Sequence, residues 1–180
     1  KLSTTKGFSP LNSSDTSISD NIGNFDDLTL SYSINRDTTN DLFYPNDGSY
    51  NDLSINYQPE DISDNSLIKL TYSNRIFFKN PRNENFIFTT NKIGLAESLN
   101  GNLKTNNAFN LGGLSFKGFE YKGIGPLSEN NIYLGGNKFF TSTFGYGSSF
   151  IFDKKDNINF KIFGTIGSLW DSDYSTNNDF

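Results

Sequence analysis

The segment Leu111–Glu120 reads Leu-Gly-Gly-Leu-Ser-Phe-Lys-Gly-Phe-Glu, and Gly-Ile-Gly-Pro (123–126) and Leu-Gly-Gly-Asn-Lys (134–138) follow it. Glycine is frequent where the backbone needs a positive φ or approaches another surface closely. A solvated loop seldom carries several large apolar side chains as well. The segment therefore predicts a long ordered loop, over residues 98–136, that folds back into a cavity and packs there. Its large apolar residues are Phe116, Phe119, Tyr121 and Ile124.

Apolar and polar residues alternate on both sides of this loop, and a period of two residues is typical of β-strands. Near the beginning, Leu30, Tyr32 and Ile34 face one way, whereas Ser31 and Ser33 face the other. The fold class is therefore all-β, with about six consecutive antiparallel strands in a meander. The predicted strands span residues 28–35, 52–57, 68–78, 86–97, 139–150 and 158–166.

The connections between these strands alternate between short and long. Short turns at one end of a sheet and long loops at the other are typical of outer-membrane barrels. Several strands also exceed the ordinary length of about 5–6 residues and reach the about 9–11 that cross a membrane. We therefore interpret the chain as part of an antiparallel transmembrane β-barrel; a soluble β-sandwich with one solvated face is the alternative. The short turns are predicted at 39–49, 80–84 and 153–156, and the loops at 1–26, 59–66, 98–136 and 171–180.

One face of such a sheet contacts lipid, and aromatic residues near the strand ends form an interfacial girdle. We expect Leu30, Tyr32, Leu70, Tyr72, Phe144 and Ile162 to point outward from the convex face. The expected girdle consists of Tyr44, Tyr50, Tyr57, Phe78, Phe150, Phe152 and Trp170.

Composition excludes several classes of function. The 180 residues include neither Cys nor His, which removes disulfides, thiolate nucleophiles and imidazole-based triads. The net charge of −5 is spread without a basic block, so we expect no nucleic-acid partner. We expect no cofactor, no metal site and no catalytic acid/base pair; Asp171 and Asp173 are interpreted as a hydrated loop rather than calcium ligands. The chain begins at Lys1 and has no Met, so we expect an internal segment of a longer protein.

The quoted motifs resemble those of BamA-type outer-membrane assembly factors, which carry an Arg-Gly-Phe/Tyr tripeptide in their sixth extracellular loop. Phe-Tyr-Pro-Asn-Asp-Gly (43–48) is similar to a turn upstream in that family, and Ile-Gly-Ser-Leu-Trp-Asp (166–171) to a strand downstream. The resemblance covers residues 26–173, with the motifs in the family's order. It implies that residues 1–180 are a partial barrel domain, similar to strands eight to thirteen of sixteen, without the POTRA domains and the other strands.

The resemblance also implies a loop-latch motif made of Lys117, Gly118, Phe119 and Glu120, supported by Gly112 and Gly113. In the family the tripeptide Arg reaches into the lumen and pairs with acidic residues on the next two strands. Lys117 replaces that Arg here, and the aligned wall positions are Gly145 and Thr165, neither of which is acidic. Both positions are predicted to face the lumen. We therefore expect Lys117 to bond to carbonyl groups and water, or to pair with another residue such as Glu120.

The resemblance implies a function that is not enzymatic: folding and inserting other barrel proteins into the bacterial outer membrane. The implied partners are the outer-membrane lipid bilayer, unfolded outer-membrane protein clients and accessory assembly lipoproteins. Three alternatives remain open at this point. They are a TamA-type or two-partner secretion pore of the same superfamily, a passive porin whose loop narrows the channel, and a soluble binding module.

Overall fold

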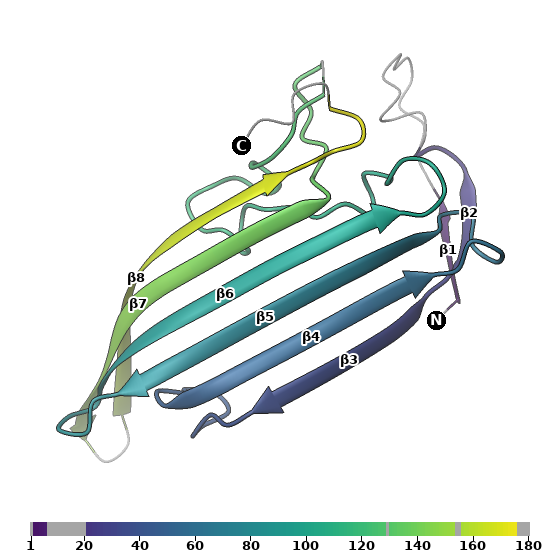
Figure 1. Ribbon diagram of the computed structural model, residues 1–180. Coiled ribbons are helices and arrows are strands. Elements are labelled where there is room, and N and C mark those ends of the chain that lie inside the picture. The colour runs from purple at the N-terminus through teal and green to yellow at the C-terminus, as the bar shows by residue number, and fades with distance from the viewer. Residues whose placement is uncertain (1, 7–20, 129, 154–155, 176–180) are drawn as a thin grey trace.

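The computed structural model describes residues 2–6, 21–128, 130–153 and 156–175. Six strands form one antiparallel sheet in which sequence neighbours are sheet neighbours, in the order β3-β4-β5-β6-β7-β8 (Figure 1). This is the predicted meander, and its long members have 13 to 16 residues, enough to cross a membrane. The strands are β3 (Leu30–Asp37), β4 (Gly48–Gln58), β5 (Leu67–Lys79), β6 (Asn85–Ser98), β7 (Lys138–Asp153) and β8 (Asp156–Trp170).

The prediction that residues 1–26 form only a surface loop is wrong at its two ends. Strand β1 (Leu2–Lys6) pairs antiparallel with β2 (Asn24–Leu28) in a separate two-stranded sheet. β2 is followed almost directly by β3, and the buried carboxylate of Asp27 ties β2 to the loop after β4. Asp27 accepts hydrogen bonds from both the backbone N–H and the side-chain amide of Asn65, at 2.8 Å each. The predicted loop between β1 and β2 lies at residues 7–20, outside the described residues.

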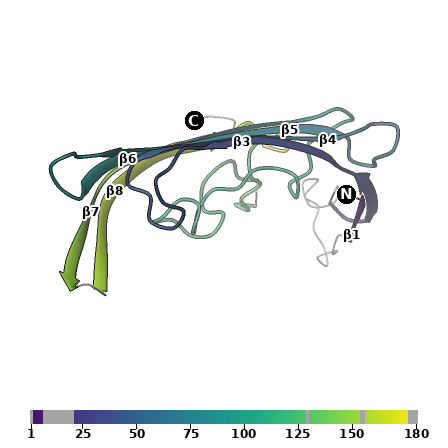
Figure 2. The ribbon, with the colours of Figure 1, turned by 90° about the horizontal axis from the view of Figure 1, so that it is seen from below.

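The main sheet is curved, and the long loop between β6 and β7 lies on its concave side (Figure 2). The described turns β3–β4 and β5–β6 lie at one end of the sheet, and the loops after β4 and β6 lie at the other (Figure 1). Both features agree with the barrel prediction. No helix of the described residues is long and apolar enough to cross a membrane.

The convex face is apolar and uncovered, as predicted from the alternation. Tyr32, Phe144 and Ile162 are all more than 60% exposed, and Leu30 and Tyr72 are also exposed. Leu70, which is half-buried, shares this face because it pairs with Ile55 and Leu95 in register. A soluble sandwich would bury these side chains between two sheets. Their exposure on a single curved sheet therefore favours a lipid-facing surface.

The concave face carries the core, which includes a cluster of Phe77, Phe86 and Phe88. Strand β6 could not be oriented from its sequence, and the structure turns its even-numbered residues inward. Glycines opposite the rings explain this arrangement. A Cβ at Gly145 would lie 2.5 Å from the Phe88 ring, and one at Gly147 would overlap the Phe86 ring. Glycine in β7 thus makes room for aromatic side chains that lie across the neighbouring strand.

Tyr50 is a correction to the predicted girdle. It pairs with Asp37 and Arg75, and the Arg75 guanidinium lies 4.5 Å above its ring on the concave side. Tyr57 and Phe78 are exposed on the convex face, as the girdle requires. The side chains of Phe150 and Phe152 fall outside those the structure describes.

Candidate functional site

The long loop begins by packing onto the inner surface of β5 and β6. Leu103 and Ala108 form a buried cluster with Leu67 and Ala96, and Leu103 is only 2% exposed. A short turn positions them, since the backbone N–H groups of Asn107 and Ala108 both donate to the carbonyl of Lys104. The loop lies inward as predicted, but its start is anchored by apolar residues that the sequence analysis did not single out. Tyr121, which it expected to pack, is 79% exposed.

Phe109 continues this attachment. Its ring stacks edge-on against Phe139 of β7 with centroids 4.7 Å apart, and the space it fills is left by Gly94, where a Cβ would collide with both rings. Lys69 of β5 places its Nζ 4.1 Å from the Phe109 centroid and donates to the carbonyl of Asn107 at 2.9 Å. Phe109 also forms a two-way backbone bridge with Gly136, which brings the two ends of the loop together.

Residues 111–124 form a closed lobe within the loop. A bridge between Leu111 and Ile124 closes its base, and Gly113 donates a backbone hydrogen bond to the carbonyl of Phe119. Gly112 has φ +127°, and a Cβ there would collide with the carbonyl oxygen of Glu120. Only glycine therefore fits where the two sides of the lobe cross. The latch motif predicted from the sequence occupies the tip of this lobe.

Phe116 is the lobe's anchor to the barrel wall. It is 8% exposed, its ring stacks edge-on against Phe119 at 5.4 Å, and it would lie 3.0 Å from a Cβ at Gly167 of β8. Leu111 adds a second contact through a buried cluster with Phe139 and Leu169. Phe119, by contrast, is 53% exposed. The lobe is therefore held chiefly through Phe116 and Leu111.

Lys117 rests on an aromatic ring. Its Nζ lies 5.1 Å from the centroid of Phe163 on β8, within the range of a cation–π contact. The ion pairs of the described residues are Lys79–Glu84 and Lys138–Asp171, so the predicted candidate Glu120 does not pair with Lys117. Glu120 acts instead through its backbone, accepting from the N–H of Gly123 at 3.0 Å.

The two predicted wall positions face the concave side in register but have neighbours of their own. Gly145 lies beneath the ring of Phe88, and Thr165 shares a 2.9 Å hydrogen bond with Thr143 across the strands. Thr165 lies two residues from Phe163, hence on the same face as the ring under Lys117. The resemblance left Lys117 without an acidic wall partner, and the geometry gives it an aromatic one instead.

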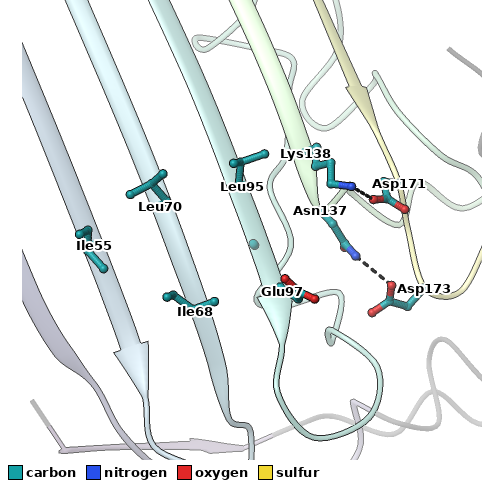
Figure 3. A pocket seen from close by; sticks show the side chains of 10 residues that line it. Ile55, Ile68, Leu70, Leu95, Glu97, Asn137, Lys138, Asp171 and Asp173 are labelled. Carbon is teal, nitrogen blue, oxygen red and sulfur yellow. Dashed lines mark hydrogen bonds and ion pairs between the residues drawn. The ribbon is translucent and has the colours of Figure 1, made fainter.

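Asp171 and Asp173 tie the ends of the loop to the rim of the sheet (Figure 3). Asp173 accepts from the backbone N–H of Leu103 at 2.6 Å and from the side chain of Asn137 at 2.9 Å. Asp171 pairs with Lys138 at 2.5 Å. We call these residues the rim clamp. It borders a hollow of about 460 Å³ whose other walls include Ile55, Ile68, Leu70 and Leu95.

Sequence reasoning predicted this acidic pair to be a hydrated loop and missed the clamp, because the partners are more than thirty residues away in the chain. It also named Phe119 rather than Phe116 as a site residue. Gly167 on β8 distinguishes the two phenylalanines, because the space left by its missing side chain is occupied by the Phe116 ring and not by Phe119. No group of three or more acidic, His or Cys residues suited to a metal occurs in the described part of the chain.

A family model for the Omp85 superfamily domain matches residues 3–180. The chain therefore belongs to the Omp85 superfamily, and its location is the bacterial outer membrane. A comparison with curated protein sequences finds no match.

Among solved structures, the chain is similar to BamA from Haemophilus ducreyi, crystallised without POTRA domains 1–3. The TM-score is 0.73 at 20% sequence identity, with 82% of this chain and 31% of that chain covered. This likeness establishes the fold, a segment of a BamA-type barrel. The chain thus spans about a third of the length of the structure it matches.

Proposed function

We propose that the chain is the loop-bearing part of a barrel that folds and inserts other β-barrel proteins into the outer membrane. The observation that carries the proposal is the lobe at residues 111–124, closed by glycine and anchored on the concave wall through Phe116. Omp85 membership and the BamA-type fold support a role in insertion or translocation. The latch sequence beside Gly-Ile-Gly-Pro (123–126) favours insertion within that range.

In this proposal the segment corresponds to strands eight to thirteen of a sixteen-strand barrel that follows POTRA domains. Its partners are the outer-membrane lipid bilayer, unfolded outer-membrane protein clients and accessory assembly lipoproteins. The work is mechanical rather than enzymatic. The docked lobe braces β7 and β8 from inside, because Leu111 touches both strands and Phe116 packs on β8.

The test uses the full-length protein in cells that depend on it. Phe116→Ala removes the buried ring, and Leu114→Ala is the matched control because Leu114 lies in the same lobe and is 97% exposed. We expect Phe116→Ala to reduce assembly of a reporter barrel at equal protein level, and Leu114→Ala to leave it unchanged. Unaltered assembly after Phe116→Ala, with the lobe released, would contradict the proposal.

A TamA-type or two-partner secretion pore of the same superfamily is the alternative. It predicts that the same variant reduces export of a secreted substrate while reporter-barrel assembly stays intact. If the protein is a passive porin, Phe116→Ala should change only its conductance.

A further inference from the structure

Basic side chains gather on the concave face of β5 to β8, although the chain's net charge is −5. The strand register places five basic residues on that face of the described strands. Among the main-sheet residues whose side chains the structure describes, the concave carboxylates are Asp37 on β3 and Asp52 on β4. The inner wall is thus divided, with positive charge on the side that carries the loop. The basic residues are Lys69, Arg75, Lys79, Lys92 and Lys161.

Aromatic rings, rather than carboxylates, support most of these cations. Lys69 lies over Phe109 at 4.1 Å, Arg75 over Tyr50 at 4.5 Å, and Lys161 between Phe86 and Phe88 at 5.5 and 5.6 Å. Lys117 in the lobe repeats the arrangement over Phe163. A ring attracts a cation through its quadrupole but carries no net charge. These contacts therefore position the cations without neutralising them.

Carboxylates are close to only part of this set. Lys79 is paired with Glu84 beside the β5–β6 turn. Asp37 lies across Tyr50 from Arg75, two strands away, which is roughly 10 Å at the usual strand spacing. Asp52 lies at the same separation from Lys92, across Ser73. Around Thr90, whose neighbours include Arg75 and Lys92, positive charge is therefore nearest.

We propose that this cationic wall makes the lumen attract anions, so that small inorganic anions enter and pass ahead of cations of equal size. A water-filled passage with low-dielectric walls concentrates ions opposite in sign to its lining. The inference rests on the barrel fold and not on the proposed assembly function. The two can therefore fail independently, because one is read from ion access and the other from reporter assembly.

The first experiment exploits the lack of cysteine in this chain. In the full-length protein, with any other cysteines replaced, Thr90→Cys places one thiol on the cationic wall. Its reaction rate is compared between thiosulfonate reagents of similar size, one carrying a sulfonate and the other a trimethylammonium group. One nearby unit charge changes the local concentration of each reagent by about threefold in water. With Arg75 and Lys92 both near Thr90, we expect the anionic reagent to react at least about tenfold faster.

Two charge variants test whether this chain causes the difference. Lys92→Gln, on the concave face next to Thr90, should lower the ratio of anionic to cationic rates by about tenfold, since it acts on both reagents. Arg36→Gln is the matched control, because it removes one positive charge from the convex face of β3. Equal rates for both reagents, or a ratio that Lys92→Gln leaves unchanged, would overturn the proposal.

Conductance gives an independent measurement. In a planar bilayer with a potassium chloride gradient, the reversal potential of the full-length protein should lie closer to the equilibrium potential of chloride than to that of potassium. Lys92→Glu combined with Lys161→Gln should move it toward the potassium side, and Arg36→Gln should not. A reversal potential on the potassium side for the unaltered protein contradicts the inference.

Discussion

The same alternating strands give the sheet two different faces: the convex face is apolar and uncovered, and the concave face is packed. On the convex face, apolar side chains such as Ile34, Phe144 and Ile162 stand more than half exposed with no protein covering them. On the concave face, glycines create spaces, and rings and the long loop fill them, as at Gly94 and Gly167. One face is suited to lipid and the other to a packed, partly aqueous interior.

The difference shows which face constrains the shape of its side chains and which constrains only their polarity. The convex face needs only apolar character, so any large apolar residue serves there. The concave face needs shape, because Phe109 and Phe116 each fit against a glycine on a neighbouring strand. Substitutions should therefore act through polarity on the convex side and through volume on the concave side.

The largest expected effect comes from removing the lipid. The isolated polypeptide 1–180 should not form a stable monomer in plain buffer, because its convex face is apolar and the edge strands β3 and β8 are unpaired. Size-exclusion chromatography and circular dichroism during heating, with and without detergent, provide the check. A monomer with a cooperative unfolding transition in buffer would break the comparison between the faces.

Phe116→Ala should have the next largest effect, on the concave side. Removing a ring that is 8% exposed should weaken lobe docking by about 3–5 kcal/mol, whereas Phe119→Ala, at a ring that is 53% exposed, should cost about 1 kcal/mol. Protease sensitivity of the loop in membranes measures both. Equal sensitivity of the two variants would mean that Phe116 does not anchor the lobe.

Neighbouring positions on β3 compare the two faces directly. Ile34→Lys places a charge on the convex face and should lower the free energy of unfolding of the full-length barrel by about 2–4 kcal/mol if it lies near the bilayer centre. Ser33→Lys, one residue away on the concave face, should change it by less than about 1 kcal/mol. Urea titration in lipid vesicles distinguishes them, and similar losses would argue that the faces are assigned wrongly.

The sequence predicts much of this architecture because period-two alternation reports local facing. The six main strands follow from it, although the facing of β6 does not; the two ends of the sheet follow from the connection lengths, and the inward loop from its glycines and large apolar residues. The alternation cannot reveal which side chain occupies which space, since Phe116 and Gly167 meet only after β7 and β8 are formed. The rim clamp was missed for the same reason: Asp173 meets Leu103 and Asn137 only once the loop closes.

A smaller effect sharpens the account of Lys117. Thr165→Asp adds a carboxylate two residues from Phe163, on the face where Lys117 rests, and should strengthen lobe docking by about 1 kcal/mol or less. The increase should disappear in Lys117→Gln. Glu at position 145 is unsuitable, because its Cβ would lie 2.5 Å from the Phe88 ring. The measurement is the rate of loop proteolysis, which should be slower in Thr165→Asp. An unchanged rate would indicate that Lys117 does not lie against β8.

The smallest predicted effect lies in the β3–β4 turn, outside both faces. Hydrogen bonds from the backbone N–H groups of Tyr44 and Phe43 lower the pKa of Asp41 below its ordinary value. A lowered folded-state pKa stabilises the turn above the unfolded pKa, and this contribution is lost as the pH falls through the folded value. The backbone amide NMR signals of Phe43 and Tyr44 in the full-length protein should therefore shift on acidification below about pH 4. In Asp41→Asn this shift should be absent.

The central claim is that the glycine-rich lobe is docked inside the barrel, and access of a protease to it is the most direct test. A short cleavage site is inserted after Gly118, where the structure leaves open space, or beside Ile62 in the loop after β4, which is 61% exposed. In intact cells that carry the full-length protein, external protease should cut at Ile62 and leave the lobe uncut. Adding Phe116→Ala should make the lobe site cleavable. Cleavage of the lobe as fast as the Ile62 site in the otherwise unaltered protein would contradict the account.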